Sequence, residues 1–383
     1  MPGKIVLFGA TGYTGRLTAE AMVERGLKPV LAARSADKLA RLADELGGEL
    51  ETRTADVSEP STVGALLEEG DVLVTTVGPF ARWGDAAASS AVTRGAHYLD
   101  STGEPLFVRE VFERYGPSAE KAGIGMLTAF GYDWVPGNLA GALALREAGL
   151  AAVRVDTGDF NLGRPSRDSM SGGTLASLAG AVAAPSFAFQ GGRIVTERGA
   201  KRHRTFPVKG KERAGVSAGA SENFTLPKLF PQLVEVNTYL GWFGPASRPM
   251  QALSAANAAA FKLPGMESLY ESAINRFAKG STGGPDAEAR ARVSSHIVGI
   301  AYDASGRQLA EVHVTGVDGY TFTGRILAWG AEQAAAGALK GAGALGPADG
   351  FGIDELRSGC EEVGLSAEVV GGERAAEKQP APA

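Results

Sequence analysis

The sequence predicts an α/β protein with two parts: a doubly wound parallel sheet at the N-terminus, and a second α+β domain with a mixed or antiparallel sheet. Over the first 130 residues, short apolar runs alternate with amphipathic helical patterns, as in parallel sheets covered on both faces. A glycine-rich loop follows the first apolar run. Farther along the chain, apolar and polar residues alternate singly, which is typical of half-exposed strands.

The N-terminal elements follow in a regular order. Apolar runs predict strands at residues 4–8, 29–33, 51–54, 72–77, 97–100 and 124–129. Helical patterns between them predict helices at residues 17–25, 36–46, 60–68 and 85–94. This alternation implies right-handed crossovers and a single parallel sheet.

The remaining chain is organised differently. Strands are predicted at residues 152–160, 295–303 and 308–317, the last two joined by a turn at 304–307. Helices are predicted near residues 171–183, 250–262, 266–279, 321–339 and 353–363. We therefore divide the chain into residues 1–135, a substrate domain at 136–330, C-terminal helices at 331–370 that pack back on the first domain, and a disordered tail at 371–383.

Composition excludes several classes of function. The chain has 383 residues and a net charge of −5, so it shows no overall preference for nucleic acid or anionic lipid. Cys360 is the single cysteine, which excludes an internal disulfide and any zinc site that needs two thiolates, and we predict no metal. The first strand starts too early for a secretory signal, and residues 175–189 are too short to span a membrane. We expect a soluble cytoplasmic protein.

The loop Gly9-Ala10-Thr11-Gly12-Tyr13-Thr14-Gly15 lies between the first strand and the first helix. Gly9 permits a tight turn, Gly12 lets the backbone approach a pyrophosphate, and Gly15 lets the helix pack closely on the strand. The N–H groups and the dipole at the helix start favour an anion. We therefore predict a Rossmann-type dinucleotide site that also uses Thr11, Tyr13 and Thr14; a glycine-rich turn without a ligand is the alternative.

The end of the second strand indicates which dinucleotide binds. A site for NAD places Asp or Glu there to bond the ribose 2′-hydroxyl, whereas this chain has Arg34 and Ser35, with Lys38 one turn later. A guanidinium suits a 2′-phosphate, so we predict NADP(H). The alternative is that Arg34 is a solvated loop residue.

Two further strand ends are candidates for cofactor contacts. Asp56, after the third strand, is placed to contact the adenine, but it could equally cap the next turn. Val77-Gly78-Pro79-Phe80 follows the fourth strand, at the edge where the nicotinamide ribose would lie.

Candidates for catalysis were sought at the same edge of the sheet. No tyrosine is followed four residues later by lysine, which disfavours the Tyr-x-x-x-Lys mechanism of short-chain reductases. Tyr132, Asp133 and Glu104 follow strand ends and could exchange a proton with a substrate. The substrate-binding candidates Ser171, Gly172, Gly173 and Thr174 open a predicted helix that could hold a carbonyl or an anion. For each of these residues a capping or other structural role is an equal alternative.

Six motifs in this order resemble one known family. They are GATGYTG at 9–15, AARS at 32–35, VGPF at 77–80, YLDSTGE at 98–104, GYDWVPGNL at 131–139 and SGGT at 171–174. Over residues 1–360 the chain resembles the saccharopine dehydrogenase-like oxidoreductases, and is most similar to the branch with the trans-acting enoyl reductases.

The resemblance implies hydride transfer from NADPH to an unsaturated substrate. In the lipid branch this is an enoyl thioester on a carrier domain of a polyketide synthase, and in the amino-acid branch it is an imine. The family's binding glycines correspond to Gly9, Gly12 and Gly15 here, and its TGE and GYD segments to Thr102–Glu104, with Gly103 beside the cofactor, and Gly131–Asp133.

Residues 197–213 depart from the acidic character of the chain, with seven Lys or Arg against two Glu. The segment could dock an acidic carrier domain, or it could be the solvated rim of a hairpin. Residues 226–249, with Tyr239, Trp242 and Phe243, could line an apolar substrate channel or belong to the core.

Three functional hypotheses follow. The first is an NADPH-dependent reductase of an activated C=C bond in lipid, polyketide or other secondary metabolism, with Tyr132 or Glu104 as the proton donor. The second is a C=N reductase, for which Arg164 and Arg167 are candidate carboxylate ligands. The third is an NADP-binding sensor without catalysis. Substrate, reaction direction, stereochemistry and oligomeric state, a homodimer included, stay open.

Overall fold

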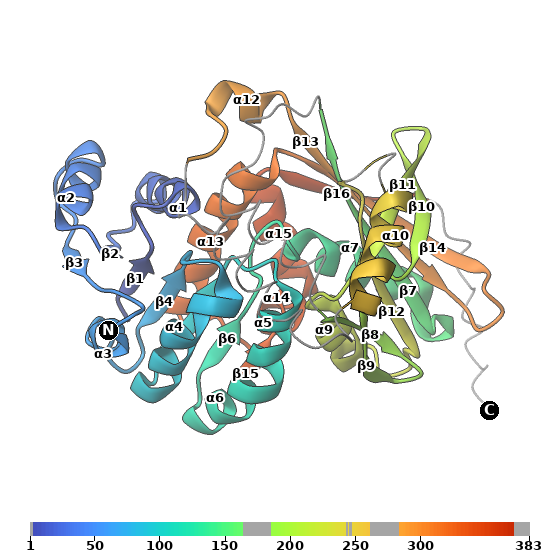
Figure 1. Ribbon diagram of the computed structural model, residues 1–383, viewed down its shortest axis with the longest axis horizontal. Coiled ribbons are helices and arrows are strands. Elements are labelled where there is room, and N and C mark those ends of the chain that lie inside the picture. Colours follow the sequence, from blue (N-terminus) through green and yellow to red (C-terminus); the bar gives the residue numbers. More distant parts are fainter. Residues whose placement is uncertain (1–2, 164–184, 243, 245–246, 261–282, 371–383) are drawn as a thin grey trace, which may run out of the picture.

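The computed structural model describes residues 3–163, 185–242, 244, 247–260 and 283–370. They form two sheets that lie side by side, with helices around and between them (Figure 1). One sheet is parallel and the other is mixed. The predicted α/β fold class is therefore confirmed.

The first sheet has seven parallel strands in the order β15-β6-β5-β4-β1-β2-β3. Their bounds are β1 Ile5–Phe8, β2 Val30–Ala33, β3 Thr52–Thr54, β4 Val72–Thr75, β5 His97–Asp100, β6 Gly125–Leu127 and β15 Gly343–Leu345. The six strands β1 to β6 have the spatial order of the Rossmann fold, so the point where the strand order reverses lies between β1 and β4. Ligands bind at the carboxyl ends of the strands beside such a point.

Helices cover this sheet at α1 Tyr13–Glu24, α2 Ala36–Glu45, α3 Pro60–Gly64, α4 Phe80–Arg94, α5 Pro105–Glu110, α6 Gly116–Ala122 and α13 Gly319–Ala335, with a π-helical turn at Val111–Tyr115. α1 and α4 begin four and five residues earlier than the sequence predicts, inside the loops that follow β1 and β4. Their N-termini therefore lie at the ligand-binding edge. α13 packs along α1, where a Cβ on Gly324 would lie 2.9 Å from the Leu17 backbone.

The second sheet has nine strands, and its main path runs β10-β11-β12-β7-β13-β14-β16, with β8 on β12 and β9 on β8. Their bounds are β7 Arg154–Leu162, β8 Pro185–Gln190, β9 Arg193–Arg198, β10 His203–Val208, β11 Lys211–Ala218, β12 Glu235–Leu240, β13 Ser294–Tyr302, β14 Gln308–Gly316 and β16 Leu365–Val369. β13 and β14 form the antiparallel pair that the sequence predicts. The buried helix α7 Val135–Ala148 packs on β7, β13 and β14, with a short 3₁₀ turn at Gly149–Ala151 after it.

The other helices are α9 Glu222–Leu229, α10 Ser247–Ala260, α12 Ala287–Ala291, α14 Pro347–Phe351 and α15 Ile353–Glu362. The C-terminal part of the chain contributes to both sheets, because β15 pairs with β6 and β16 pairs with β14. The helices predicted near 171–183 and 266–279 and the tail 371–383 lie outside the described residues. No described helix is long and apolar enough to cross a membrane.

Candidate functional site

The loop after β1 has the geometry of a phosphate cradle. Gly9 has a φ of +90°, and a Cβ on Gly15 would lie 2.1 Å from the Gly9 carbonyl oxygen, so neither position accepts a side chain without a shift. A Cβ on Gly12 would meet only that same oxygen, at 3.2 Å. The space in front of Gly12 is therefore open, as the approach of a pyrophosphate requires.

The helix that starts at this loop has no side-chain cap. Gly12 is the N-cap of α1, and no side chain of the described residues caps the helix. Those N–H groups and the helix dipole favour a bound anion. Thr14 at this helix start also lines the cavity described below. Loop and helix together fit the dinucleotide pyrophosphate that the sequence predicts.

The turn after β2 presents cations to solvent. Arg34 and Lys38 are exposed, and neither forms an ion pair with a carboxylate of the described residues. Ser35 caps α2, because its hydroxyl accepts a hydrogen bond from the Lys38 N–H at 3.4 Å. Arg34 is therefore available for a 2′-phosphate, while Ser35 has a structural role as well.

Asp56 has a structural role in the turn after β3. Its Oδ1 accepts hydrogen bonds from the backbone N–H and the hydroxyl of Ser58, at 2.9 and 2.8 Å. These bonds hold the pKa of Asp56 below its usual value, and the charge of Arg34 contributes less. This geometry favours the turn-capping alternative over a contact with the adenine.

Glu104 binds the start of α4. Its two carboxylate oxygens accept hydrogen bonds from the N–H groups of Phe80 and Ala81, at 2.7 and 3.0 Å. The segment Val77–Phe80 is thereby tied to the end of β5, with a cis peptide bond between Gly78 and Pro79. Because both oxygens are occupied by backbone donors, the geometry favours a capping role for Glu104 over proton donation.

A cavity of about 220 Å³ lies where the two sheets meet. Its wall combines Thr14 of the glycine loop, Ser101 after β5 and the pair Tyr132 and Asp133 after β6. The second sheet and its connections contribute the end of β7, Trp242 and the segment from Pro285 to Val293, and the start of α13 completes it. This volume is below the roughly 300–1,000 Å³ of typical ligand sites, so it suits the reacting ends of two molecules rather than a whole substrate.

Asp133 is the titratable group best suited to proton transfer in this cavity. Burial raises its pKa to about 7, and its Oδ1 has no hydrogen-bond partner among the described residues. A Cβ on Gly103 would lie 2.8 Å from Asp133 Oδ2, so that glycine makes room for the carboxyl group. An acid that is half protonated near neutral pH meets the requirement for general acid catalysis.

Tyr132 forms part of the cavity wall beside it. Its hydroxyl donates to the Phe160 carbonyl at 3.3 Å, and burial raises its pKa well above the usual value. The ring packs on Trp242 and Phe322, with centroids 6.5 and 6.4 Å away. The hydroxyl proton is directed at a backbone oxygen, which makes Tyr132 a weaker candidate for the donor than Asp133.

Two further buried carboxyl groups lie behind this pair, and the sequence does not predict them. Asp159 in β7 and Glu222 at the start of α9 both approach Gly137, where a Cβ would lie 3.7 Å from Asp159 Oδ2 and 2.2 Å from Glu222 Oε1. Burial raises both pKa values strongly, and proximity to Asp133 adds to the effect. No pattern in the sequence singles out Asp159, because the predicted strand 152–160 already alternates apolar and polar residues.

The remaining predicted residues fall into two groups. Tyr239 belongs to a buried cluster of the second sheet, whereas Trp242 lines the cavity, so the two alternatives for residues 226–249 each hold in part. Ser171, Gly172, Gly173, Thr174, Arg164, Arg167 and Phe243 lie outside the described residues.

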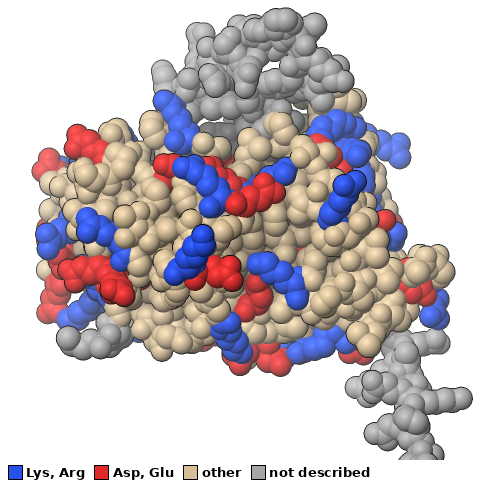
Figure 2. All heavy atoms as spheres, turned by 90° about the horizontal axis from the view of Figure 1, so that it is seen from below, with Lys and Arg blue, Asp and Glu red and all other residues tan. Residues whose placement is uncertain are grey.

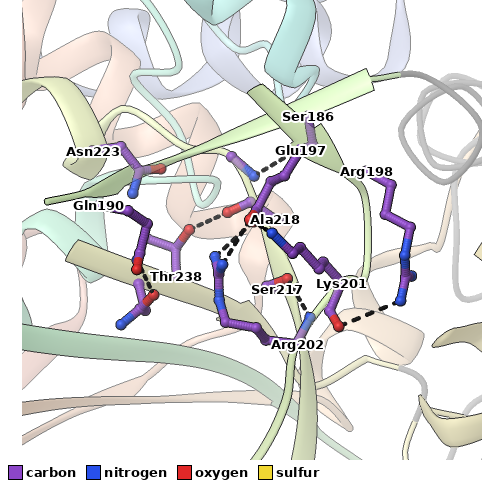
Figure 3. Close-up of polar contacts among 12 residues, drawn as sticks. Ser186, Gln190, Glu197, Arg198, Lys201, Arg202, Ser217, Ala218, Asn223 and Thr238 are labelled. Carbon is purple, nitrogen blue, oxygen red and sulfur yellow. Dashed lines mark hydrogen bonds and ion pairs between the residues drawn. The ribbon is translucent and has the colours of Figure 1, made fainter. Parts of the chain in front are cut away.

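Three of the seven cations in the basic segment 197–213 pair with carboxylates, and a fourth binds backbone carbonyls. Figure 3 shows Arg202 and Lys201 turned toward the buried Glu197, with nitrogen–oxygen distances of 2.6 and 3.3 Å. Arg198 donates to backbone carbonyls, and Arg204 pairs with Asp156. The cations of the exposed β10–β11 turn, Lys209, Lys211 and Arg213, have no ion-pair partner among the residues described.

Comparison with known proteins identifies the N-terminal part. Residues 5–127 match the family model of the saccharopine dehydrogenase NADP binding domain. A putative trans-acting enoyl reductase of Mycobacterium tuberculosis is 37% identical over 180 residues, 45% of this chain and 43% of that protein. A trans-acting enoyl reductase of Mycobacterium bovis is 32% identical over 203 residues, 50% of this chain and 48% of that protein. The match thus spans less than half the length of these curated relatives.

A solved structure shares the fold over nearly the whole chain. Apo saccharopine dehydrogenase (L-Glu forming) from Saccharomyces cerevisiae has a TM-score of 0.60 at 15% identity, covering 96% of this chain and 100% of that one. Fold and loop geometry together define a Rossmann-type dinucleotide-binding protein. More particularly, residues 5–127 are similar to the saccharopine dehydrogenase NADP binding domain, which confirms the predicted resemblance and supports NADP(H) as the cofactor.

Proposed function

We propose that the protein is an NADPH-dependent reductase of an activated C=C bond, with an enoyl thioester as the substrate class. The observation that carries the proposal is a partly buried acid, Asp133, in a cavity next to the glycine loop of a segment that matches an NADP-binding domain. The names of the curated relatives support the same chemistry. The C=N reductase and the sensor stay as the alternatives that the assay below separates.

The cofactor would be held by the loop from Gly9 to Gly15, with Thr11, Tyr13 and Thr14, and by Arg34, Ser35 and Lys38 at the 2′-phosphate. Val77–Phe80 and Gly103 would lie beside its nicotinamide end. When bound, NADPH supplies a hydride to the β-carbon of the substrate. The chain itself orients the substrate and excludes water through the wall of Tyr132 and Trp242.

Proton transfer is assigned to Asp133. In its protonated form the carboxyl group donates its proton to the α-carbon, and the carboxylate is protonated again before the next turnover. Its unpartnered Oδ1 is not committed to another donor. Tyr132 positions the substrate against Asp133. The predicted substrate residues Ser171 to Thr174 would stabilise the developing negative charge on the thioester oxygen.

Consumption of NADPH with defined substrates tests the proposal. The absorbance of NADPH is followed with an enoyl thioester on pantetheine, with the same acyl group on a carrier domain, and with an amine–carbonyl pair that forms an imine. Oxidation with the thioesters alone is the expected result. Turnover of the imine pair alone would replace the C=C assignment, and tight NADPH binding with no turnover across the panel would favour the sensor.

The 2′-phosphate contact gives a separate prediction. Arg34→Ala should weaken NADPH binding by roughly 10- to 100-fold, because one charge-assisted phosphate contact is lost. NADH affinity should change little, which fluorescence titration of both nucleotides measures. Arg53→Ala, an exposed arginine in the neighbouring strand β3, is the control. Equal loss of NADPH and NADH affinity would exclude a role specific to the 2′-phosphate.

Four further properties belong to the proposal. A carrier-bound substrate would dock at the β10–β11 turn through Lys209, Lys211 and Arg213, since the other cations of 197–213 are engaged. Figure 2 shows acidic and basic side chains interspersed over the described part of the face that is seen from below relative to Figure 1, so this face has no patch of a single sign. A faster rate with the carrier-bound thioester, reversed by charge removal at this turn, supports docking. We also propose domain boundaries at residues 135 and 330, which limited proteolysis tests. A homodimer is tested by sedimentation, and a cytoplasmic location by cell fractionation.

A further inference from the structure

Arg290 lies against the N-terminal glycine loop although it is far from that loop in the chain. It belongs to the segment that leads into β13 of the second sheet. Its Nη1 donates to the hydroxyl of Tyr13 and to the Pro285 carbonyl, both at 3.0 Å. Its Nε donates to Thr321 Oγ1 at 3.3 Å. Figure 1 shows α12, which contains Arg290, above α1. These contacts hold the guanidinium in one position next to the start of α1.

The charge of Arg290 is not neutralised by the described part of the chain. No described carboxylate lies within ion-pair distance, whereas the nearby Arg292 pairs with Glu288 and Arg16 pairs with Glu20 and Glu45. Arg290 is half-buried and lines the cavity together with Thr14. Asp133 and Asp318 line the same cavity, but neither forms an ion pair with Arg290, and Asp318 Oδ1 accepts hydrogen bonds from the N–H groups at the start of α13. A guanidinium held in place without an ion-pair partner favours a bound anion.

The surroundings indicate which anion this is. Gly12, the N-cap of α1 with open space in front of it, directly precedes Tyr13, whose hydroxyl accepts the hydrogen bond from Arg290. A Cβ on Gly284 would lie 2.7 Å from the Tyr13 ring, so the segment before α12 is seated directly on the loop. A guanidinium and a helix start on one side of a cavity are complementary to phosphate oxygens.

We propose that Arg290 is a cofactor-binding residue contributed from outside the Rossmann sheet, which binds the pyrophosphate of NADP(H) opposite the glycine loop. The inference rests on the proposed function for the identity of the dinucleotide. Its consequence is that the cofactor joins the two halves of the cavity, because residues 285–293 form part of the substrate wall.

Nucleotide binding tests this without any substrate. Arg290→Met keeps most of the side-chain volume and removes the charge, and should weaken NADPH binding by roughly 10- to 100-fold in a fluorescence titration. Adenosine 2′-monophosphate, which has the 2′-phosphate but no pyrophosphate, should bind the variant within about twofold of its wild-type affinity. Arg292→Met is the matched control, because this exposed arginine lies two residues after Arg290 and pairs with Glu288. The control variant should bind NADPH within about twofold of the wild-type affinity.

The outcomes separate the two claims. Unchanged NADPH affinity in Arg290→Met would overturn the inference and leave the proposed function standing, with Arg290 then free for a substrate carboxylate. Equal weakening of NADPH and adenosine 2′-monophosphate would also overturn it, because the defect would then not concern the pyrophosphate. A wild-type protein that binds no dinucleotide would remove both claims. Thermal unfolding of the nucleotide-free variants, expected to match the wild type, guards against loss of fold.

Discussion

Replacement of Asp133 by asparagine is expected to lower the rate of enoyl reduction by roughly 10²- to 10⁴-fold, the usual contribution of a positioned general acid. Asparagine has the same shape as aspartic acid but cannot deliver a proton to the α-carbon. NADPH affinity should stay close to that of the wild type, which the same titration measures. Tyr132→Phe should retain most of the activity, since its hydroxyl donates to the Phe160 carbonyl. The opposite ranking of the two variants would make Tyr132 the donor, as the sequence analysis first suggests.

The pH profile gives this prediction a second readout. Because donation requires the protonated form and the pKa of Asp133 is about 7, the rate should fall as the pH rises through 7. Asp354→Asn, the same change at an exposed carboxylate paired with Arg146, is the control and should keep the wild-type profile. The interval from pH 6 to pH 8 extends roughly one unit on either side of that pKa. A wild-type rate that does not change across this interval would argue against Asp133 as the acid.

Stability should respond to pH in the same range. The pKa of Asp133 is raised from 3.8 in the unfolded chain to about 7, so the folded protein binds a proton more tightly and stability is lost as the pH rises between these values. Up to about 4 kcal/mol is involved at full ionisation, by the conversion of three pKa units. The wild type should therefore lose more stability than Asp133→Asn when the pH is raised from 5 to 8. Thermal unfolding of both proteins at the two pH values measures this difference.

Alanine at Gly12 and at Gly15 is expected to abolish cofactor binding for two different reasons. A Cβ on Gly15 would lie 2.1 Å from the Gly9 carbonyl oxygen, so the loop and α1 must move apart and stability should fall. A Cβ on Gly12 meets only that oxygen, at 3.2 Å, so the variant should fold with nearly normal stability. It would still place a methyl group where the pyrophosphate approaches.

Calorimetry with and without NADPH measures both effects. We expect Gly12→Ala to show nearly the wild-type unfolding temperature without nucleotide and no increase with it. Gly15→Ala should unfold at a lower temperature in both conditions. Gly64→Ala is the control, because the nearest atom to its added Cβ is 3.6 Å away in the Arg94 side chain and the residue lies far from the loop. A normal NADPH shift in Gly12→Ala would contradict the placement of the pyrophosphate.

Prediction from sequence succeeded where the information was local. Strands with continuous apolar runs, such as β1 and β4, and the β13–β14 hairpin were predicted within one or two residues. The starts of α1 and α4 were predicted too late, because Tyr13 and Phe80 belong to loop motifs and carry no helical periodicity of their own. The short helix α14 was not predicted, although Pro347 is compatible with a first helical turn.

The candidate site divides in the same way. The glycine loop, the strand before it and the helix after it are contiguous in the chain, and each imposes a local requirement on the backbone. Residues 9–15 and the cation at Arg34 could therefore be inferred without coordinates. The roles of Glu104, Asp159, Glu222 and Arg290 could not, because each depends on a partner far away in the chain. Burial determines whether an acid is protonated, and distance determines whether a cation is neutralised. Both quantities exist only once the two sheets have packed against each other.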